Sequence, residues 1–452
     1  MRLAVIGSLL GMTLPTIAQT PTLQPALVHE PIAQPLPYRQ APAPAAKPLA
    51  ASFNVADFEA LAQDLTVGER VPGLAMAIVH DGQVLSARGY GVTDVRDPQP
   101  VNAHTVFRMA SLSKAFAGTM TGLLVQDGVL RWDSKVADYV PSFHLADPQA
   151  TGQVTVADLL SHRTGLRWHN AFDSDIENNA DYYTVSQKLA TAPLGCRPGE
   201  CYNYQNVAFS LVGDVVFAAT GSFYEQAVDR RIFKPLGMND ASIGLAGIEG
   251  SPSWAHPHVR GRGGWASIMP KPTYYRLAPA AGVNASISDL AQWVNAQLGH
   301  RPDVLPAPLL ATLHAPLIST PGEMKSGWRH ERVSSSGYAM GWRVLDYAGE
   351  QVIFHAGAVE GYRGLVAMVP GRDLGLVILW NSTSALPSGL LPTVLDAALG
   401  LPAQQWVDSP LGRQWMLAQA NHATSPRALA AEGDDDESEA GASSGKSVAS
   451  PR

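Results

Sequence analysis

The sequence contains no long run of lysine and arginine, and its net charge of -7 is spread thinly over 452 residues. A phosphate backbone is therefore not expected as a partner, which argues against nucleic-acid binding. Cysteine is also scarce, because Cys196 and Cys201 are the only two. Two thiols make a poor zinc site, and the pair His256 and His258 has no cysteine or carboxylate beside it in the sequence. We expect neither a metal nor a cofactor.

Long apolar runs are missing except at the start, where Arg2 precedes an apolar run from Leu3 to Leu14. That run is shorter than the ~20 residues with which a helix spans a bilayer, and small residues follow it. Residues 1–18 are therefore predicted to be a signal peptide, with an uncleaved anchor as the alternative. We expect no stable membrane span and a periplasmic or secreted protein.

The two cysteines lie close together in "GCRPGECYNY", with Pro198 and Gly199 between them. This spacing suits a turn, and an exported protein meets an oxidising compartment. We therefore predict a local disulfide between Cys196 and Cys201. The alternative is a pair of reduced thiols.

Composition divides the chain into a central unit and two flanks. Residues 19–51 are rich in proline and alanine and are predicted to be an extended linker. Residues 426–452 are acidic and then rich in serine and glycine, so a disordered tail is predicted. Between them we place a domain at 52–405 and an extension at 406–425.

Strand-like segments occur at both ends of the central unit. "LAMAIVHDGQVLSARGYGV" contains a predicted hairpin at Asp81 and Gly82, and four short apolar runs follow residue 336. Helical segments fill the middle, among them "SISDLAQWVNAQLG", where Ser288 is a candidate cap. The predicted fold class is α+β. An antiparallel sheet is flanked by helices and completed by both chain ends, with an inserted, mostly helical lobe at roughly 112–300.

The first chemical signal is "FRMASLSKAF", which places Ser111 and Lys114 one helical turn apart. Residues 112–126 are apolar nearly all round, which indicates a buried helix that opens at Ser111 and ends at Gly128. Burial favours the neutral form of a lysine, and a neutral amine can take a serine proton. The spacing alone is weak evidence, because Ser443 and Lys446 repeat it in the predicted tail.

Two later motifs support the first one. Tyr204-Gln205-Asn206 is the only Tyr-x-Asn in the chain and precedes another apolar helix. His355-Ala356-Gly357 lies on a predicted strand near the end of the sheet, whereas His80-Asp81-Gly82 has the same form but falls in the first hairpin turn.

With these three motifs in this order, the chain resembles the serine β-lactamase and penicillin-binding-protein superfamily. Within it, the similarity is to the class C-like branch of β-lactamases, D-aminopeptidases and esterases. The resemblance covers about residues 55 to 400 and extends to "LLVQDGVLRWDSKVADYVP", "TVADLLSHRTGL", "APAAGVNASISDLAQW" and "GYAMGW".

The resemblance implies that Ser111 is acylated and that Lys114 and Tyr204 share the proton transfers. It implies that Asn206 positions the substrate amide and the lysine. In this family a water molecule then hydrolyses the acyl-enzyme.

The third motif is implied to lie along the substrate, with His355 and Gly357 on the docking strand. The backbone N–H groups of Ser111 and Ala358 would form the oxyanion hole. His162, in "SHRTGL", is interpreted as a loop residue under the site rather than a base.

One departure concerns the third motif, where β-lactamases of this branch usually carry Lys-Thr-Gly. His355 is mostly neutral at pH 7 and supplies no fixed charge for a carboxylate. The change favours an esterase or peptidase over a true β-lactamase. Arg363, six residues after Gly357, is a candidate for restoring the charge.

The prediction is a secreted serine hydrolase acting on an amide, ester or lactam, with a small molecule or a peptide as substrate. A true class C-like β-lactamase is one alternative. A non-catalytic protein that binds penicillin or cell-wall peptide is another, and a scaffold that has lost activity is a third. The sequence does not specify the oligomeric state.

Overall fold

The structure, a computed structural model, describes residues 46–325 and 327–414. The predicted signal peptide, most of the predicted linker and the predicted tail lie outside these residues. Within them, the main element is an eight-stranded antiparallel sheet in the order β2-β1-β13-β12-β11-β10-β9-β8. Its strands are β1 (Gly73–His80), β2 (Gln83–Gly91), β8 (Ile318–Ser319), β9 (Val333–Tyr338), β10 (Arg343–Tyr347), β11 (Glu350–Val359), β12 (Tyr362–Val369) and β13 (Leu374–Trp380).

The two ends of the central unit meet in this sheet, because β1 pairs with β13. β1 and β2 form the predicted hairpin, in which Asp81 and Gly82 have φ values of 51° and 69°. Positive φ at both positions is the geometry of the tightest hairpin turns. The predicted fold class, an α+β fold with a sheet completed by both chain ends, is confirmed.

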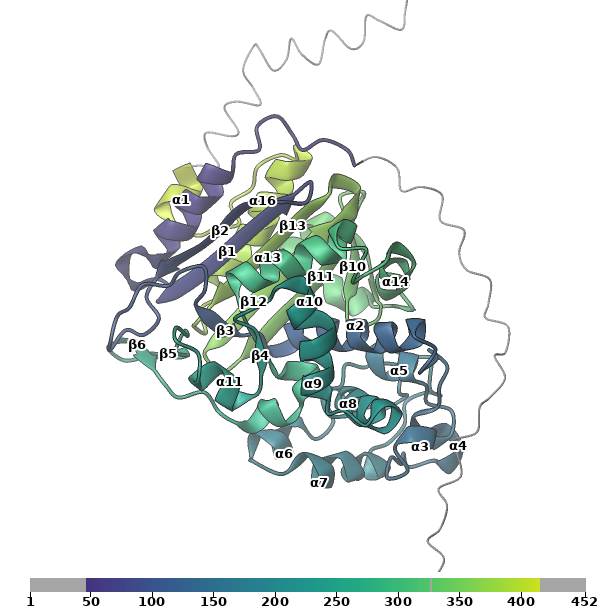
Figure 1. The fold of residues 1–452 in the computed structure, drawn as a ribbon. Helices are drawn as coiled ribbons and strands as arrows, with labels where there is room; N and C mark the ends of the chain where they lie inside the picture. The colour runs from purple at the N-terminus through teal and green to yellow at the C-terminus, as the bar shows by residue number, and fades with distance from the viewer. Residues whose placement is uncertain (1–45, 326, 415–452) are drawn as a thin grey trace, which may run out of the picture. The chain divides into compact units, whose positions relative to one another are not determined.

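Helices cover both faces of the sheet (Figure 1). On one face, α1 (Val55–Thr66) and α16 (Leu390–Leu399) pack on a core that includes Phe58, Ile78, Trp380 and Val394. On the other face, α13 (Ile287–Asn295) packs on β1 and β13, and a larger core extends from there into the helical lobe. The functional candidates lie on this second side.

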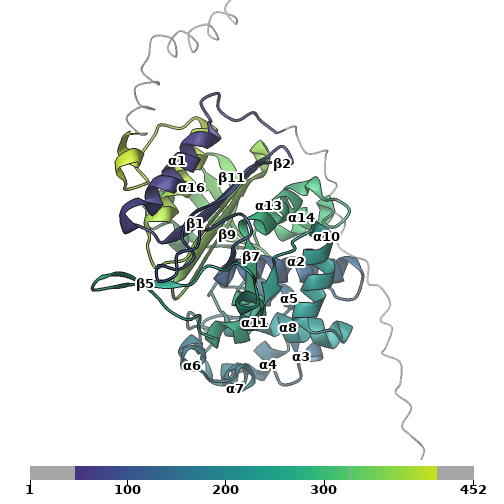
Figure 2. The same ribbon diagram turned by 60° about the vertical axis from the view of Figure 1, so that its left-hand side comes forward.

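The helical lobe follows β2 in the chain and lies beside the second face (Figure 2). It contains α2 (Ser113–Gln126), α3 (Val136–Tyr139), α4 (Pro148–Thr151), α5 (Val156–Leu160), α6 (Asp173–Glu177), α7 (Tyr182–Gln187), α8 (Val207–Thr220), α9 (Tyr224–Val228), α10 (Lys234–Leu236) and α11 (Leu245–Glu249). The remaining elements are a three-stranded sheet of β3 (Val106–Arg108), β7 (Val283–Ser286) and β4 (Ser242–Ile243), the hairpin of β5 (His258–Gly261) and β6 (Gly264–Ser267), and the helices α12 (Ala278–Ala281), α14 (Ala307–Leu313) and α15 (Gly327–Arg332).

The predicted cap of α13 is wrong by two residues. The cap is Ser286, whose hydroxyl accepts the Asp289 N–H while the Asp289 carboxylate accepts the Ser286 N–H. This reciprocal capping box satisfies two backbone donors, whereas Ser288 lies inside the first turn.

Hydrogen bonds with the domain begin before residue 52, the predicted start. The Lys47 N–H donates to Gly371 O at 2.9 Å, and the Ala50 N–H donates to Ala398 O at 3.0 Å. At the other end, the Trp406 indole donates to Asp396 of α16 at 2.7 Å. The described part of the predicted extension therefore packs on the domain.

None of the described helices is by itself both long and apolar enough to cross a membrane. The segments Val207–Thr220 and Tyr224–Leu236 reach that length and composition only together, and they are bent by 76° where they meet.

Candidate active site

Ser111 lies in a tight turn between β3 and α2. A short 3₁₀ turn, Ala110–Leu112, joins the strand to the helix, so Ser111 immediately precedes the first turn of α2. Ala110 has a φ of 48°, a left-handed conformation that costs a residue with a Cβ of order 1 kcal/mol. The residues of α2 from Ser113 to Leu124 are all buried, so the core of the lobe holds the turn in place.

Two glycines let the sheet approach this turn. Gly357 on β11 and Gly364 on β12 are direct cross-strand partners. A Cβ added to Gly357 would lie 2.5 Å from the Met109 carbonyl oxygen, and one added to Gly364 would lie 3.0 Å from Leu112 Cδ1. β11 and β12 can lie this close to the serine turn only because both positions are glycine.

Lys114 is fully buried and reaches back from α2 to the serine. Its Nζ lies 3.3 Å from Ser111 Oγ, 2.7 Å from Asn206 Oδ1 and 3.1 Å from the Ala280 carbonyl oxygen. Burial lowers the pKa of Lys114 well below its usual value, the Asp173 carboxylate partly opposes this, and Arg343 lowers it further. The neutral amine is therefore more accessible than in an ordinary lysine.

Tyr204 packs against the same ammonium group, with its ring centroid 4.6 Å from Lys114 Nζ. Burial raises the pKa of Tyr204 to about 12, although the nearby Arg343 guanidinium and a hydrogen bond with Ser111 act in the opposite direction. At neutral pH the phenol therefore keeps its proton and is a donor.

Asn206 is oriented by an acidic residue that sequence reasoning did not identify. Its Nδ2 donates to Asp173 Oδ2 at 2.7 Å, which turns its Oδ1 towards Lys114. Burial raises the pKa of Asp173 to about 6, opposed by hydrogen bonding from Asn206 and by the charge of Lys114. The sequence around Asp173, "AFDSDIENNADYY", contains several acidic residues and no pattern that distinguishes this one.

His355 does not lie on the cavity surface, which corrects its predicted place along the substrate. The side chain is 1% exposed, and its Nε2 lies 2.9 Å from the Tyr338 hydroxyl and 3.3 Å from Arg343 Nη1. Burial and the Arg343 charge lower the pKa of His355 well below its usual value. His355 is therefore a neutral residue beneath the site.

His162, Tyr338 and His355 form one buried chain of hydrogen bonds whose direction follows from its first donor. The Gln205 N–H donates to His162 Nδ1 at 3.1 Å, so the His162 proton is on Nε2 and is donated to the Tyr338 oxygen. Tyr338 then donates to His355 Nε2, and His355 Nδ1–H donates to the Ala356 carbonyl oxygen at 2.7 Å. As interpreted from the sequence, His162 lies under the site, where its ring centroid is 4.2 Å from that of Tyr204.

Arg343 was also missed, although it directly follows the segment "GYAMGW". Its Nη2 pairs with Glu323 Oε1 at 2.9 Å, and its guanidinium lies 5.4 Å from the ring centroid of Tyr204. Arg343 is therefore a partly buried positive charge next to the tyrosine, and it does not line the cavity.

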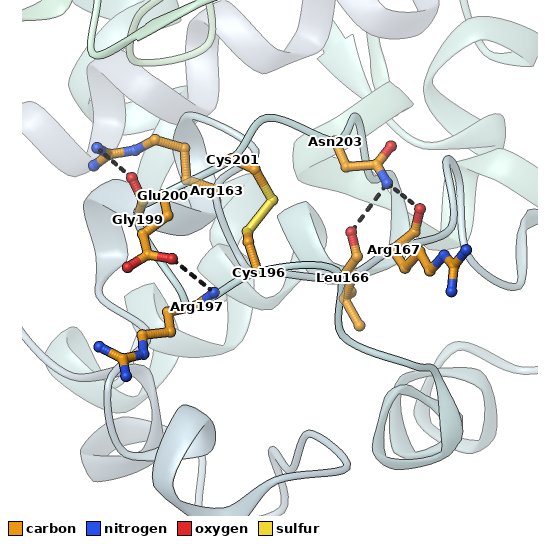
Figure 3. Close-up of a disulfide and its surroundings, with 9 residues drawn as sticks. All are labelled: Arg163, Leu166, Arg167, Cys196, Arg197, Gly199, Glu200, Cys201 and Asn203. Atoms are coloured by element: carbon orange, nitrogen blue, oxygen red, sulfur yellow. Dashed lines mark hydrogen bonds between the residues drawn. A yellow bond between two sulfur atoms is a disulfide. The ribbon is translucent and has the colours of Figure 1, made fainter.

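A disulfide joins Cys196 and Cys201 and anchors the segment that leads to Tyr204 (Figure 3). Within its loop, the Arg197 N–H donates to Glu200 Oε2 at 3.2 Å. Just beyond it, Asn203 Nδ2 donates to the carbonyl oxygens of Leu166 and Arg167 (Figure 3). These bonds fix the backbone immediately before the tyrosine.

A cavity of about 520 Å³ opens over the serine turn. Its lining includes Asp173, residues of the first two motifs and the residue that follows the third motif: Ser111, Tyr204, Asn206 and Ala358. Tyr204, Asn206 and Ala358 thus share one cavity with the serine, and Lys114 contacts Ser111 from beneath the surface.

Arg363, the candidate for a restored charge, lies on the other face of the sheet. It pairs directly with Ala358 on β11 and with Trp380 on β13. Side chains of directly paired residues share a face, and Trp380 belongs to the core under α1 and α16. Arg363 is not among the residues that line the cavity.

No cluster of three or more histidine, cysteine, aspartate or glutamate residues suited to a metal ion occurs in the described part of the chain. The two histidines noted in the sequence, His256 and His258, lie near one carboxylate, that of Asp94.

A family model described as Beta-lactamase matches residues 58–400 of the chain. Among curated proteins, the unguisins hydrolase ungD of Aspergillus violaceofuscus (strain CBS 115571) is 25% identical over 385 residues, which cover 78% of this chain and 66% of that protein. The protein flp of Staphylococcus aureus (strain COL) is 27% identical over 323 residues, 71% of this chain and 61% of that protein. The chain thus spans just under two thirds of the length of these relatives.

Two solved structures have a similar fold. The octameric penicillin-binding protein homologue from Pyrococcus abyssi matches with a TM-score of 0.67 and 24% identity, over 77% of this chain and 78% of that one. SurE matches with a TM-score of 0.62 and 24% identity, over 76% and 77%.

Proposed function

The chain belongs to the beta-lactamase family, and from this premise we propose that it is a serine hydrolase that forms an acyl-enzyme at Ser111. The observation that carries the proposal is the 3.3 Å approach of Lys114 Nζ, with its lowered pKa, to Ser111 Oγ at the wall of a cavity. A serine hydroxyl needs such a base to become a nucleophile near neutral pH.

In the proposed acylation, neutral Lys114 takes the Ser111 proton while Oγ attacks the substrate carbonyl carbon. The carbonyl oxygen becomes an oxyanion, and the backbone N–H groups of Ser111 and Ala358 stabilise it. The bond to the leaving group then breaks, and that group receives a proton. Tyr204 is suited to deliver it, because its raised pKa keeps the phenol protonated and it packs against the lysine that replenishes it.

In the proposed deacylation, a water molecule loses a proton to the same Lys114 and Tyr204 pair and attacks the ester carbonyl. The bond to Ser111 Oγ breaks, the serine regains its proton and the acid is released. Asn206, held by Asp173, keeps the lysine in position through both steps.

Among substrates, we rank esters and peptide amides above β-lactams. His355 is buried and neutral, so the third motif gives no charge to bind the carboxylate of an antibiotic. A β-lactamase is the second candidate, and it is supported by the family model alone.

The test compares three substrates: a p-nitrophenyl short-chain ester, a D-alanyl peptide and a chromogenic cephalosporin. We expect turnover of the ester or the peptide to exceed that of the cephalosporin, and Ser111→Ala to abolish it. A dominant cephalosporinase activity would favour the second candidate. Inertness towards all three, with no covalent adduct, would overturn the proposal.

Intact-mass measurement after addition of a penicillin separates an enzyme from a binding protein. A transient adduct on the protein is expected for an enzyme, because water releases the acyl group. An adduct that persists without turnover of any of the three substrates would instead identify a penicillin-binding protein.

We further propose a periplasmic or secreted location. The signal-like residues 1–18 support it, and so does the Cys196–Cys201 disulfide, since such bonds persist in oxidising compartments. Cell fractionation with an antibody against the domain tests it, and recovery in the cytoplasmic fraction alone would contradict it.

A further inference from the structure

The cavity over Ser111 contains a buried positive charge that the proposed chemistry does not use. Arg108 ends β3, three residues before the serine, and is 4% exposed. It lines the same cavity as Ser111, Asn206 and Ala358.

The guanidinium of Arg108 is only partly satisfied. Nη1 donates to the Lys271 carbonyl oxygen at 2.9 Å, and the group lies 3.7 Å from the ring centroid of Tyr275. Nε and Nη2 have no hydrogen-bond partner, and within the described residues no carboxylate forms a salt bridge with Arg108. Nε and Nη2 form the edge of a guanidinium that binds carboxylates in a bidentate manner.

Two partly buried arginines have the anion that Arg108 lacks, whereas Arg329, whose Nε also has no hydrogen-bond partner, has none among the described residues. Arg343 pairs with Glu323 at 2.9 Å, and Arg332 pairs with Asp396 at 2.9 Å. A buried charge is costly without a partner, so an arginine left unpaired at a cavity wall favours an anion in that cavity.

The remaining charges around the cavity leave this role to Arg108. Lys271 is paired with Glu360 at 2.6 Å, and both are substantially exposed. Glu177 is exposed and accepts from the Tyr274 hydroxyl at 2.9 Å. Asp173 accepts hydrogen bonds from Asn206 and Tyr274 through Oδ2, while its Oδ1 has no partner. Tyr275 donates its hydroxyl to Asn284.

We propose that Arg108 forms the anion subsite of this cavity and that the preferred substrates are esters or amides carrying a carboxylate near the scissile bond. This inference rests on the proposed acylation of Ser111. Arg108, on the strand that precedes the serine, would supply the positive charge that the third motif lacks. His355 is neutral, and Arg363 lies on the face of the sheet covered by α1 and α16.

The test uses two matched pairs of esters, because the carboxylate can lie on either side of the scissile bond. One pair is the mono-p-nitrophenyl ester of adipate and its methyl ester, with the charge on the acyl group. The other is 3-acetoxybenzoate and its methyl ester, with the charge on the leaving group. For at least one pair, we expect kcat/KM to be at least about tenfold higher for the anion, as one charge-assisted hydrogen bond provides.

In Arg108→Gln we expect that ratio to fall to about one, mainly through a higher KM for the anionic ester. If Arg108 only supports the backbone at Lys271, the substitution should lower kcat/KM for the anionic and the neutral ester alike and leave their ratio unchanged. A fall in the ratio therefore indicates a role in binding the anion. Arg363→Gln is the matched control and should keep the wild-type ratio. If Arg108→Gln does not fold, the wild-type ratios and competitive inhibition by free adipate decide the question.

Wild-type enzyme that hydrolyses neutral esters as well as anionic ones, or prefers them, would overturn the anion subsite while leaving the acyl-enzyme intact. Equal anion preference in wild type and Arg108→Gln would do the same. Absence of any Ser111-dependent hydrolysis would instead remove the proposed function on which the subsite rests.

Discussion

Lys114 and Tyr204 lie side by side, yet burial affects their pKa values in opposite directions. The lysine loses its proton more easily because its charged form is desolvated, whereas the tyrosine holds its proton more tightly for the same reason. One group is thereby suited to be the base and the other the acid, without a histidine in contact with the serine.

This division of roles predicts the pH dependence of activity. Because the base must be neutral, kcat/KM should rise with pH through the lowered pKa of Lys114 and level off well below 10.5, the ordinary lysine value. Lys114→Arg keeps the charge but cannot lose the proton, so kcat/KM should fall by about 10² to 10⁴. Steady-state rates measured across pH check both points.

Lys188→Arg is the control, since Lys188 pairs with Asp175 and neither residue lines the cavity. It should retain the wild-type profile. A Lys114→Arg enzyme with normal rates would show that another group takes the serine proton.

The residues that position the catalytic side chains were harder to predict from the sequence than the catalytic side chains themselves. Ser111, Lys114, Tyr204 and Asn206 occur in short local patterns that a sequence displays. Asp173 contacts Asn206 only through a loop 33 residues away, so no spacing reveals it. His355 belongs to a motif, but its burial depends on three strands pairing around it, and the motif alone suggested contact with substrate.

At the scale of elements, the site depends on how closely β11 approaches the serine turn. Gly357→Ala would place a methyl group 2.5 Å from the Met109 carbonyl oxygen, so the strand or the turn must move. We expect a loss of about 1–3 kcal/mol in unfolding free energy, typical of overpacking, and a larger proportional loss of kcat than of substrate binding.

Gly263→Ala is the control for that variant, because a Cβ there meets nothing within 4 Å. Chemical denaturation and steady-state kinetics of both variants give the comparison. Full activity in Gly357→Ala would mean that Ala358 need not lie against the serine turn.

Elements differed in how far the sequence determined them. The hairpin at Asp81 and Gly82 and the buried helix after Ser111 follow from local chemistry, and both were predicted correctly. The cap of α13 was placed at Ser288 because it lies nearest the apolar pattern. The structure uses Ser286, where β7 ends and the chain can adopt the extended conformation that a cap requires.

At the scale of the whole molecule, the buried neutral histidines make the free energy of unfolding depend on pH. Burial lowers the pKa values of His162 and His355 well below 6.5 and that of His314 to about 4. The folded protein therefore keeps these rings neutral where the unfolded chain would protonate them. The stability they contribute is present above the unfolded pKa of about 6.5 and is lost as pH falls below it.

The expected slope is about 1.4 kcal/mol of unfolding free energy per pH unit for each histidine that stays neutral. Denaturant titrations between pH 7 and 5 measure it. His355→Gln, which keeps an acceptor for Tyr338, should reduce the slope by about that amount for one histidine. An unchanged slope would show that His355 is charged in the folded state or does not titrate in the unfolded one.

The arrangement of the whole domain was predictable, because the sequence patterns predict strands at both ends of the central unit and helices in its middle. The position of the cavity was not, since it depends on the meeting of α2, α8 and β11 from distant parts of the chain. The same is true of Arg108, whose place beside Ser111 is visible in the sequence but whose lack of a partner is not.

Active-site labelling tests the central claim most directly. The protein is treated with a fluorophosphonate or a fluorescent penicillin, and the modified peptide is identified by mass spectrometry. We expect label on the peptide containing Ser111, none in Ser111→Ala, and normal labelling in Ser443→Ala, which removes the other Ser-x-x-Lys serine. Labelling that survives Ser111→Ala would contradict the assignment of Ser111 as the nucleophile.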